Sequence, residues 1–308
     1  MELDLTPSSL RVYEALSSKT RLKILEFIGG NRRSISEIAT FLNMSNSITT
    51  RHVQQLEDCG ILDSERGRGQ DRNKKIVFLK VDHINITFPA KIHHEYQLYS
   101  AQLKLGHFTN FLATPTCGLA TETHIVGKFD DPRYFLDPER TNADLLWFHT
   151  GFVEYVIPNF LTESSTAKLL ELSFEISSEF PIPNQLCPSD ISIYINDVKV
   201  ATYTTPGNFS DTRGRYTPDW WNDNFSQYGL LKRLRISELD TGIDGTKYSD
   251  VNLQDLNLHD DSFIKIKFAV EDDAVNKCGL TLFGKSFGNH QQDILVNLYY
   301  VDFDEGNL

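Results

Sequence analysis

Residues 35–62 read ISEIATFLNMSNSITTRHVQQLEDCGIL, two short amphipathic segments separated by a turn. Apolar residues of the first segment recur at helical spacing, at Ile35, Ile38, Ala39 and Leu42. Ser36 with Glu37 is predicted to open this helix. The next residues, 43–45, are typical of a turn, and Ser45 or Asn46 is a good N-cap for a second helix. The stretch therefore predicts two helices joined by a tight turn.

The second helix is predicted to bury Ile48, Val53 and Leu56, with His52 at the boundary. Polar side chains remain on its other face: Ser47, Thr49, Thr50, Arg51, Gln54 and Gln55. These residue types hydrogen-bond base edges and phosphates, with Arg suited to guanine and Gln to adenine. Together with Ser45, this face is predicted to contact double-stranded DNA, with the N-terminal residues of the helix in the major groove.

A basic hairpin follows the second helix. Strands are predicted from Ile61 and at residues 76–79, and the tip between them reads ERGRGQDRNKK at 65–75. Its cations are predicted phosphate contacts: Arg66, Arg68, Arg72, Lys74 and Lys75. Such a hairpin beside a helix pair is a wing, which would lie over a phosphate or the minor groove. The alternative is an ordinary helical domain with a solvated polar face and a charged hairpin.

Residues 15–25, ALSSKTRLKIL, and 51–56, RHVQQL, resemble the ArsR-type winged-helix repressors. The resemblance extends over about residues 10–82, roughly a quarter of the chain. It implies a homodimer whose two recognition helices bind an inverted-repeat operator, with an effector that alters affinity. Founding members sense metals through Cys-x-Cys in the helix before the turn. Because residues 33–39 contain neither Cys nor His, we expect no metal site of that kind, and we expect no cofactor.

Charge is distributed unevenly along the 308 residues, whose net charge is −12. Residues 1–85 hold 13 Lys and Arg against 11 Asp and Glu, net +2, whereas the remainder holds 17 against 31, net −14. Phosphate contacts supply most of the non-specific affinity for DNA. The acidic remainder would repel DNA, so contact is expected only at the basic face of the first domain.

Cys59, Cys117, Cys187 and Cys278 lie far apart without a C-x-x-C pattern, and we predict four free thiols in a reducing cytosol. The N-terminus, Met1-Glu2-Leu3-Asp4, lacks the features of a signal peptide. No apolar run approaches the ~20 residues that span a bilayer. We therefore expect a cytoplasmic protein with no membrane partner.

The second half of the sequence shows strand-like alternation. Period-two segments lie at residues 151–158, 167–176, 191–200, 231–236, 262–270 and 294–300. Gly, Pro, Asn and Asp turns join them, and Asn196-Asp197 indicates a hairpin. This pattern predicts an antiparallel β-sandwich. The fold class is thus α+β and multidomain: a winged helix-turn-helix (1–85), a loop-rich connecting segment packed on the sandwich (86–145) and a jelly-roll-like sandwich (146–308).

About residues 145–303 resemble galactose-binding-like jelly rolls in pattern, which implies a carbohydrate-binding role. Candidate ligand residues lie in the long segment 205–224: Asn208, Asp211, Arg213, Trp220 and Trp221. Exposed aromatic rings stack on sugars while the polar groups hydrogen-bond hydroxyls. The alternative is that both tryptophans fill one end of the sandwich core.

Catalytic motifs are not evident, since the sequence has no Gly-x-Ser-x-Gly elbow, phosphate loop or dinucleotide fingerprint. We predict that the protein is not an enzyme. Carboxylates such as Glu154, Glu171 and Glu175 could form a glycosidase pair if a cleft joined them. Glu171 and Glu175 fall on one face of a strand, however, and a solvated outer face explains them. The neighbours His93 and His94 would point to opposite faces of a strand, so no metal site is predicted.

The sequence predicts a DNA-binding transcriptional regulator whose sandwich senses a small polar ligand such as a carbohydrate. Two alternatives stay open. One is a carbohydrate-active enzyme fused to a winged helix, with paired carboxylates in a cleft. The other is a sandwich that serves protein interaction or oligomerisation and has a dry apolar face.

Overall fold

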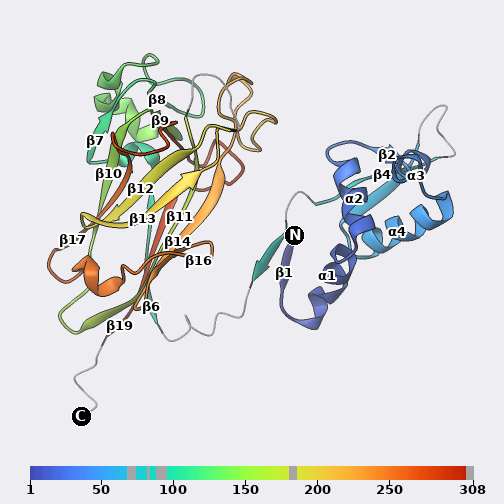
Figure 1. Cartoon of the computed structure of the whole chain (residues 1–308), viewed down its shortest axis with the longest axis horizontal. Helices are drawn as coiled ribbons and strands as arrows, with labels where there is room; N and C mark the ends of the chain where they lie inside the picture. The colour runs from blue at the N-terminus through green and yellow to red at the C-terminus, as the bar shows by residue number, and fades with distance from the viewer. Residues whose placement is uncertain (68–73, 82–83, 88–95, 180–185, 303–308) are drawn as a thin grey trace, which may run out of the picture. The chain divides into compact units, whose positions relative to one another are not determined.

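The computed structural model describes residues 1–67, 74–81, 84–87, 96–179 and 186–302. The chain forms two compact units, Met1–Lys91 and Ile92–Leu308 (Figure 1). Helices dominate the first unit and strands the second. The α+β class and its two architectures are therefore confirmed.

The first unit has four α-helices among its described residues: α1 Leu10–Leu16, α2 Lys19–Ile28, α3 Ile35–Leu42 and α4 Asn46–Asp58. Its antiparallel sheet has the order β2-β4-β3, with β2 Arg33–Ser34, β3 Leu62–Arg66 and β4 Lys75–Leu79. A short 3₁₀ helix, η1 Pro7–Ser9, follows β1 (Glu2–Asp4), which pairs in parallel with β5 (Asn85–Thr87). The helix-turn-helix and the two wing strands are thus confirmed.

Hydrogen bonds at the helix ends explain where α3 and α4 begin. The N-cap of α3 is Ser34 rather than Ser36: its hydroxyl accepts from the Glu37 amide, and the Glu37 carboxylate accepts from the Ser34 amide at 2.7 Å. With this capping box the helix begins at Ile35, one residue before the predicted opening at Ser36. Ser45 caps α4 as expected, accepting from the Ile48 amide at 3.3 Å.

The second unit contains two antiparallel sheets. The five-stranded sheet has the order β13-β12-β17-β10-β7, with β7 Asn110–Ala113, β10 Gly151–Pro158, β12 Ser189–Ile195, β13 Val198–Thr205 and β17 Phe263–Val270. In the nine-stranded sheet, the path β16-β15-β14-β11-β18-β9-β8 is joined by β19, which pairs with β11 and β6. Its strands are β6 Gln97–Leu103, β8 Gly118–Ala120, β9 Leu145–Phe148, β11 Ser165–Ser177, β14 Leu230–Ser237, β15 Thr241–Ile243, β16 Thr246–Ser249, β18 Leu280–Phe283 and β19 Ile294–Asp302.

Side chains from both sheets share one core, which makes the unit a sandwich. Phe174 of β11 and Phe268 of β17 are both buried, and their ring centroids lie 4.9 Å apart. Between β12 and β13, Asn196 and Asp197 have φ of 47° and 66°. Positive φ at both turn residues is the requirement of a type I′ turn, so the predicted Asn-Asp hairpin is confirmed.

The segment 86–145, expected as a loop-rich connection, contributes β6, β7, β8 and the first residue of β9 to these sheets. Irregular backbone between those strands is organised by three 3₁₀ helices, η3 Leu105–His107, η4 Pro132–Leu136 and η5 Pro138–Asn142, and a further one, η6 Leu253–Leu256, lies later in the chain. In the described part of the chain, no helix is both long and apolar enough to cross a membrane.

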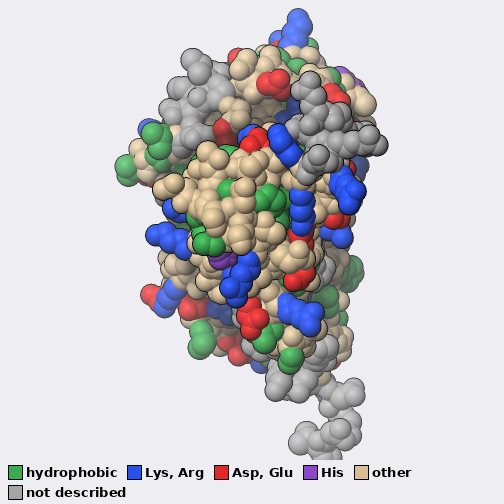
Figure 2. Space-filling model, turned by 90° about the vertical axis from the view of Figure 1, so that its right-hand side faces the viewer, with side chains coloured by type: hydrophobic (Ala, Val, Ile, Leu, Met, Phe, Trp, Pro, Cys, Tyr) green, Lys and Arg blue, Asp and Glu red, His purple; other side chains and the backbone are tan. Residues whose placement is uncertain are grey.

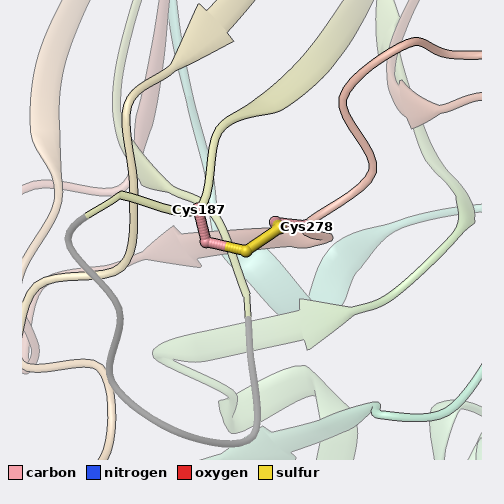
Figure 3. Close-up of a disulfide and its surroundings, with 2 residues drawn as sticks. All are labelled: Cys187 and Cys278. Carbon is pink, nitrogen blue, oxygen red and sulfur yellow. A yellow bond between two sulfur atoms is a disulfide. The ribbon is translucent and has the colours of Figure 1, made fainter.

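Two of the four cysteines form a disulfide, Cys187–Cys278 (Figure 3). Their Cα atoms lie 5.7 Å apart although 91 residues separate them in sequence. The prediction of four free thiols is therefore wrong for this pair and correct for Cys59 and Cys117. Local spacing carried no sign of the bond, because the sandwich fold brings the two segments together.

The double variant Cys187→Ser/Cys278→Ser is expected to lose about 2–5 kcal/mol of unfolding free energy, since the bond closes a long loop in the unfolded chain. Urea unfolding followed by far-UV circular dichroism measures the change. Cys59→Ser, in the other unit, is the control and should leave the sandwich transition unchanged. Unfolding of the double variant at the wild-type midpoint under oxidising conditions would contradict the expectation.

Candidate functional site

The outward face of α4 is the candidate nucleic-acid interface. Thr49, Val53 and Leu56 are its buried residues, at the spacing of one helical face. Ser47, Arg51 and Gln54 are exposed on the opposite side. The prediction that Thr49 faces outward and Ile48 inward is wrong: Thr49 is fully buried and Ile48 is 49% exposed. The Thr49 hydroxyl is satisfied inside the helix, because it donates to the Ser45 carbonyl at 3.0 Å.

Three of the polar side chains on α4 differ in their freedom to reach a ligand. Arg51 is exposed and forms no ion pair with a described residue. Gln54 donates to the Asp58 carboxylate at 2.8 Å on the helix surface. Gln55, by contrast, accepts from Arg21 of α2 at 2.6 Å, which directs its amide toward α2. Arg51 and Gln54 are therefore better placed than Gln55 for contact with bases.

His52 lies at the edge of this face, half-buried as expected. Burial lowers the pKa of its imidazole, and the nearby charges of Arg21 and Arg51 lower it further. The imidazole is consequently neutral near pH 7 and adds no positive charge to α4.

The wing cations are not equivalent. Lys75 pairs with Glu57 of α4 at 2.6 Å and is partly buried, so it fastens the wing to the helix. Arg66 and Lys74 are exposed. Arg68 and Arg72 lie outside the described residues. On the face seen in Figure 2, Lys and Arg side chains are interspersed with Asp and Glu side chains around a broad area of uncharged atoms.

The candidate ligand residues of the sandwich do not form one site. Asn208 is buried and accepts from Ser226 at 2.9 Å. Asp211 accepts from the Tyr228 hydroxyl at 2.8 Å. Arg213 donates to the carbonyls of Pro218 and Trp221 and pairs with Asp223. These three polar side chains hold the 205–224 segment in place.

The two tryptophans lie on different surfaces of that segment. Trp220 is 40% exposed, and its indole N–H donates to the Glu122 carbonyl at 2.6 Å. It borders an open groove of about 410 Å³ lined by Glu122, Thr123, Tyr216, Pro218, Trp220, Lys285, Ser286 and Gln291. Trp221 is buried and donates to the Ser226 carbonyl at 3.0 Å. The alternative that the tryptophans fill the core thus holds for Trp221 only.

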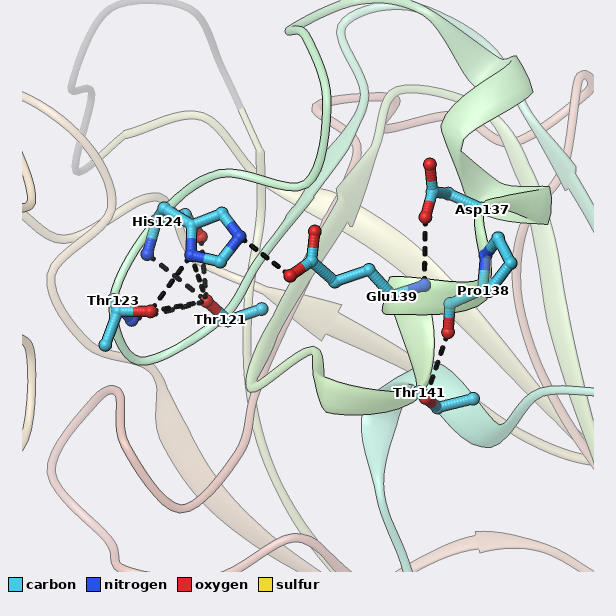
Figure 4. A network of polar contacts seen from close by, with 7 residues as sticks. All are labelled: Thr121, Thr123, His124, Asp137, Pro138, Glu139 and Thr141. Atoms are coloured by element: carbon cyan, nitrogen blue, oxygen red, sulfur yellow. Dashed lines mark hydrogen bonds and ion pairs between the residues drawn. The ribbon is translucent and has the colours of Figure 1, made fainter.

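A polar network supports the wall of the Trp220 groove (Figure 4). His124 Nε2 lies 2.9 Å from Glu139 Oε1, and its Nδ1 lies 2.9 Å from the Thr123 hydroxyl. The buried Thr121 hydroxyl accepts from the His124 amide at 3.2 Å. Glu139 belongs to η5, so these contacts fix the loop that carries Glu122 and Thr123 against that helix.

A second, more enclosed cavity of about 200 Å³ lies beneath Trp221. It is lined by Thr116, Phe129, Asp130, Leu145, Trp147, Glu179, Trp221, Phe225, Ser226 and Thr281. Sequence reasoning singled out Trp221 alone from this set. The other aromatic residues and both carboxylates come from four separate segments, so no local pattern identified them.

Glu175 was expected on a solvated face and is buried instead, 1% exposed. Its carboxylate accepts from the amides of Gly229 at 2.8 Å, Asn289 at 2.9 Å and His290 at 2.8 Å. Burial raises its pKa to about 7, against the lowering effect of these donors. Glu175 therefore holds together three backbone segments of the nine-stranded sheet and its loops.

Of the carboxylates considered for a glycosidase pair, Glu171 and Glu175 do not meet. Glu171 and Glu175 are four residues apart on β11, a separation of about 13 Å between Cα atoms in extended chain. Such pairs in glycosidases require roughly 5–9.5 Å between carboxyl groups. Within the described residues, no group of three or more His, Cys, Asp and Glu side chains is arranged to hold a metal ion. His93 and His94 lie outside those residues.

Comparison with known proteins identifies the first unit. Residues 18–64, which comprise α2, α3, α4 and the start of β3, match the family described as bacterial regulatory protein, arsR family. A comparison with curated proteins finds no match.

Three solved structures are similar to about a quarter of the chain. A possible transcriptional regulatory protein from Mycobacterium bovis (fragment 1–100) is 26% identical over 23% of this chain and 71% of its own, with a TM-score of 0.21. A homodimeric winged helix-turn-helix DNA-binding domain from the same organism is 24% identical over 23% of this chain and 61% of its own, with a TM-score of 0.21. HlyU from Vibrio cholerae is 22% identical over 23% of this chain and 73% of its own, with a TM-score of 0.21. On the match of residues 18–64, the first unit is a winged helix-turn-helix DNA-binding domain of the arsR type.

Proposed function

We propose that the protein is a transcriptional regulator that reads double-stranded DNA through α4. The observation that carries this proposal is the exposed polar face of α4 inside the region that matches the arsR family. Arg51 and Gln54 have the chemistry to hydrogen-bond guanine and adenine edges in the major groove. Ile48, exposed beside them, supplies an apolar contact for a thymine methyl group.

The remaining predicted contacts serve the phosphate backbone in this proposal. Ser45, Ser47 and Thr50 lie at or near the N-terminus of α4, where hydroxyl groups and backbone amides suit phosphate oxygens. Arg66 and Lys74, with Arg68 and Arg72 of the same tip, neutralise phosphates flanking the groove.

A homodimer completes the proposed regulator. Two copies would place their α4 helices in successive major grooves, so the operator is an inverted repeat with half-sites about 34–36 Å apart. Leu10 on α1 and Leu22 on α2 are 51% and 49% exposed, and dimerisation would remove such apolar surface from water. We place this dimer in the cytoplasm, where its duplex target lies.

The sandwich is proposed as the sensory domain, and a carbohydrate in the Trp220 groove as its ligand. An exposed indole face suits a sugar ring, while Tyr216, Lys285 and Gln291 offer polar partners for hydroxyl groups. By linkage, a ligand shifts operator affinity by no more than the difference between its own binding free energies for the two conformations of the protein. This difference is commonly about 1–3 kcal/mol.

The sensing proposal is tested with a duplex obtained by selection from random sequences on the full chain. The affinity of the full chain for this selected duplex is measured with and without a panel of monosaccharides. One sugar is expected to change the Kd about 5- to 150-fold. Trp220→Ala should abolish this response while leaving the sugar-free Kd unchanged. Phe263→Ala, which removes an exposed ring from β17, is the matched control and should respond like wild type. Sugar-independent binding throughout, or an unaltered response of Trp220→Ala, would contradict the proposal.

A further inference from the structure

Four aromatic rings form a closed cycle of contacts around the enclosed cavity. Successive ring centroids lie 5.7 Å apart for Phe129–Trp147, 5.8 Å for Trp147–Trp221, 5.2 Å for Trp221–Phe225 and 5.6 Å for Phe225–Phe129. Neighbouring planes are inclined by 47° to 65°, so the rings enclose a space instead of stacking on one another. All four line the cavity of about 200 Å³.

A carboxylate stands in the wall of this aromatic cage. Glu179 Oε2 accepts from the Thr281 hydroxyl at 2.7 Å and from the Ser226 hydroxyl at 3.3 Å. Its other oxygen, Oε1, receives no hydrogen bond from the described residues, and Glu179 forms no ion pair with them. The Glu179 amide donates to the Cys278 carbonyl, so the segment with the disulfide holds this residue in position.

Asp130 is a second acidic residue in the cavity wall. It is exposed, and its Oδ1 accepts from the Cys117 amide at 3.0 Å. Among the described residues that line the cavity, none is Lys or Arg. The cavity thus has aromatic walls and two acidic side chains, with no Lys or Arg among the described residues that line it.

Burial in this environment disfavours a charge on Glu179. The pKa of the Glu179 carboxyl is raised to about 8, chiefly by burial and to a smaller extent by the nearby charge of Asp130, against the lowering effect of the hydrogen bonds from Thr281 and Ser226. A positive charge inside the cavity would reverse this balance, because an opposite charge a few ångströms away favours the ionised carboxylate. Aromatic faces also attract cations through their quadrupoles, most strongly where water is excluded.

We propose that this cavity binds a small organic cation, with its ammonium group inside the cage of Phe129, Trp147, Trp221 and Phe225 and against Glu179. A neutral sugar fits the same walls less well. Its hydroxyls need several hydrogen-bond partners, whereas the polar groups here are few and two hydroxyls are already committed to Glu179. The site is distinct from the Trp220 groove, since the two share no lining residue.

The experiment titrates the full chain with tetramethylammonium, with choline, and with the uncharged isostere of choline in which a tert-butyl group replaces trimethylammonium. Trp fluorescence and calorimetry both report binding, since two tryptophans line the cavity. Saturable binding of a cation is expected, at least about tenfold tighter for choline than for its isostere. Equal binding of the isostere, or no binding of either cation in the millimolar range, would overturn the proposal.

Two variants separate charge from shape. Glu179→Gln keeps the side-chain volume and should weaken choline binding about tenfold or more while leaving binding of the isostere unchanged. Asp130→Asn should also weaken choline binding. Because Asp130 is exposed, this substitution does not change the packing of a buried side chain. Glu163→Gln, an exposed glutamate outside the cavity, is the matched control. Wild-type choline affinity in both Glu179→Gln and Asp130→Asn would overturn the proposal.

The pH dependence provides an independent readout. Cation binding requires an ionised Glu179, whose pKa is raised to about 8 in the free protein, so binding expels a proton below that pH. Choline affinity is expected to rise by up to about tenfold per pH unit as pH approaches 8, and then to level off. Asp130 is the other acidic residue in the cavity wall. A flat profile in wild type, equal to that of Glu179→Gln, would contradict the assignment.

Discussion

Arg51→Ala is expected to weaken binding of the selected duplex by about 1–3 kcal/mol, or roughly 5- to 150-fold in Kd. The guanidinium is exposed on α4 and unpaired among the described residues, so its loss removes a base contact and leaves the fold intact. Base preference should relax at one position per half-site. Equilibrium binding to duplexes that differ at single positions measures both effects.

Variants at neighbouring positions provide the controls for Arg51. Lys74→Ala should weaken binding of all duplexes alike, because a phosphate contact carries no sequence information. It should also reduce the slope of log K against log salt concentration by about 1, because one phosphate contact is lost. Gln55→Ala should alter specificity least, because that amide is held by Arg21. If Arg51→Ala and Lys74→Ala both lowered affinity uniformly across sequences, α4 would not be reading bases.

Glu175→Ala is expected to destabilise the sandwich by about 3–5 kcal/mol. The change leaves three backbone amides, of Gly229, Asn289 and His290, without their acceptor. Gly288, with φ of +77°, packs directly against the Glu175 carboxylate. The surrounding backbone is therefore not expected to move easily into the space that the glutamate side chain leaves. Urea unfolding of the full chain, followed through the strand signal in circular dichroism, measures the loss.

Glu171→Ala is the matched control, four residues earlier on the same strand and only half-buried. It should cost less than about 1 kcal/mol. A similar loss in both variants would show that the buried amide contacts of Glu175 do not hold the sheet and its loops together.

The same residue gives the sandwich a pH dependence. The pKa of Glu175 is raised to about 7 in the folded protein, above its ordinary value in the unfolded chain. Between those two values the folded state binds more protons at Glu175, so the contribution of this residue to stability falls as pH rises and levels off above about 7. This part of the pH dependence should be absent from Glu175→Ala.

Local patterns in the sequence were sufficient for the helix pair, the wing strands and the β12–β13 hairpin. Each depends on periodicity or on turn residues within a few positions of one another. The inward face of α4 was assigned wrongly at two positions, Ile48 and Thr49, because a β-branched threonine was treated as polar. Thr49 satisfies its hydroxyl on the Ser45 carbonyl and can therefore be buried, whereas the predicted set of Ile48, Val53 and Leu56 does not follow helical spacing.

Long-range features of the sandwich were beyond sequence reasoning. Cys187 and Cys278 are 91 residues apart, and Glu175 meets amides more than 50 residues away in the chain. The aromatic cage draws its rings from residues between 129 and 225, each in a segment with its own local pattern. Only the pairing of distant strands places these groups together.

The central claim, that α4 reads a specific duplex, is tested most directly by selecting from random duplexes with the purified full-length protein and sequencing the bound fraction. We expect enrichment of an inverted repeat whose half-sites are centred about 10–10.5 base pairs, or a multiple of that spacing, apart. A bound fraction no more enriched in any sequence than the starting pool would contradict it.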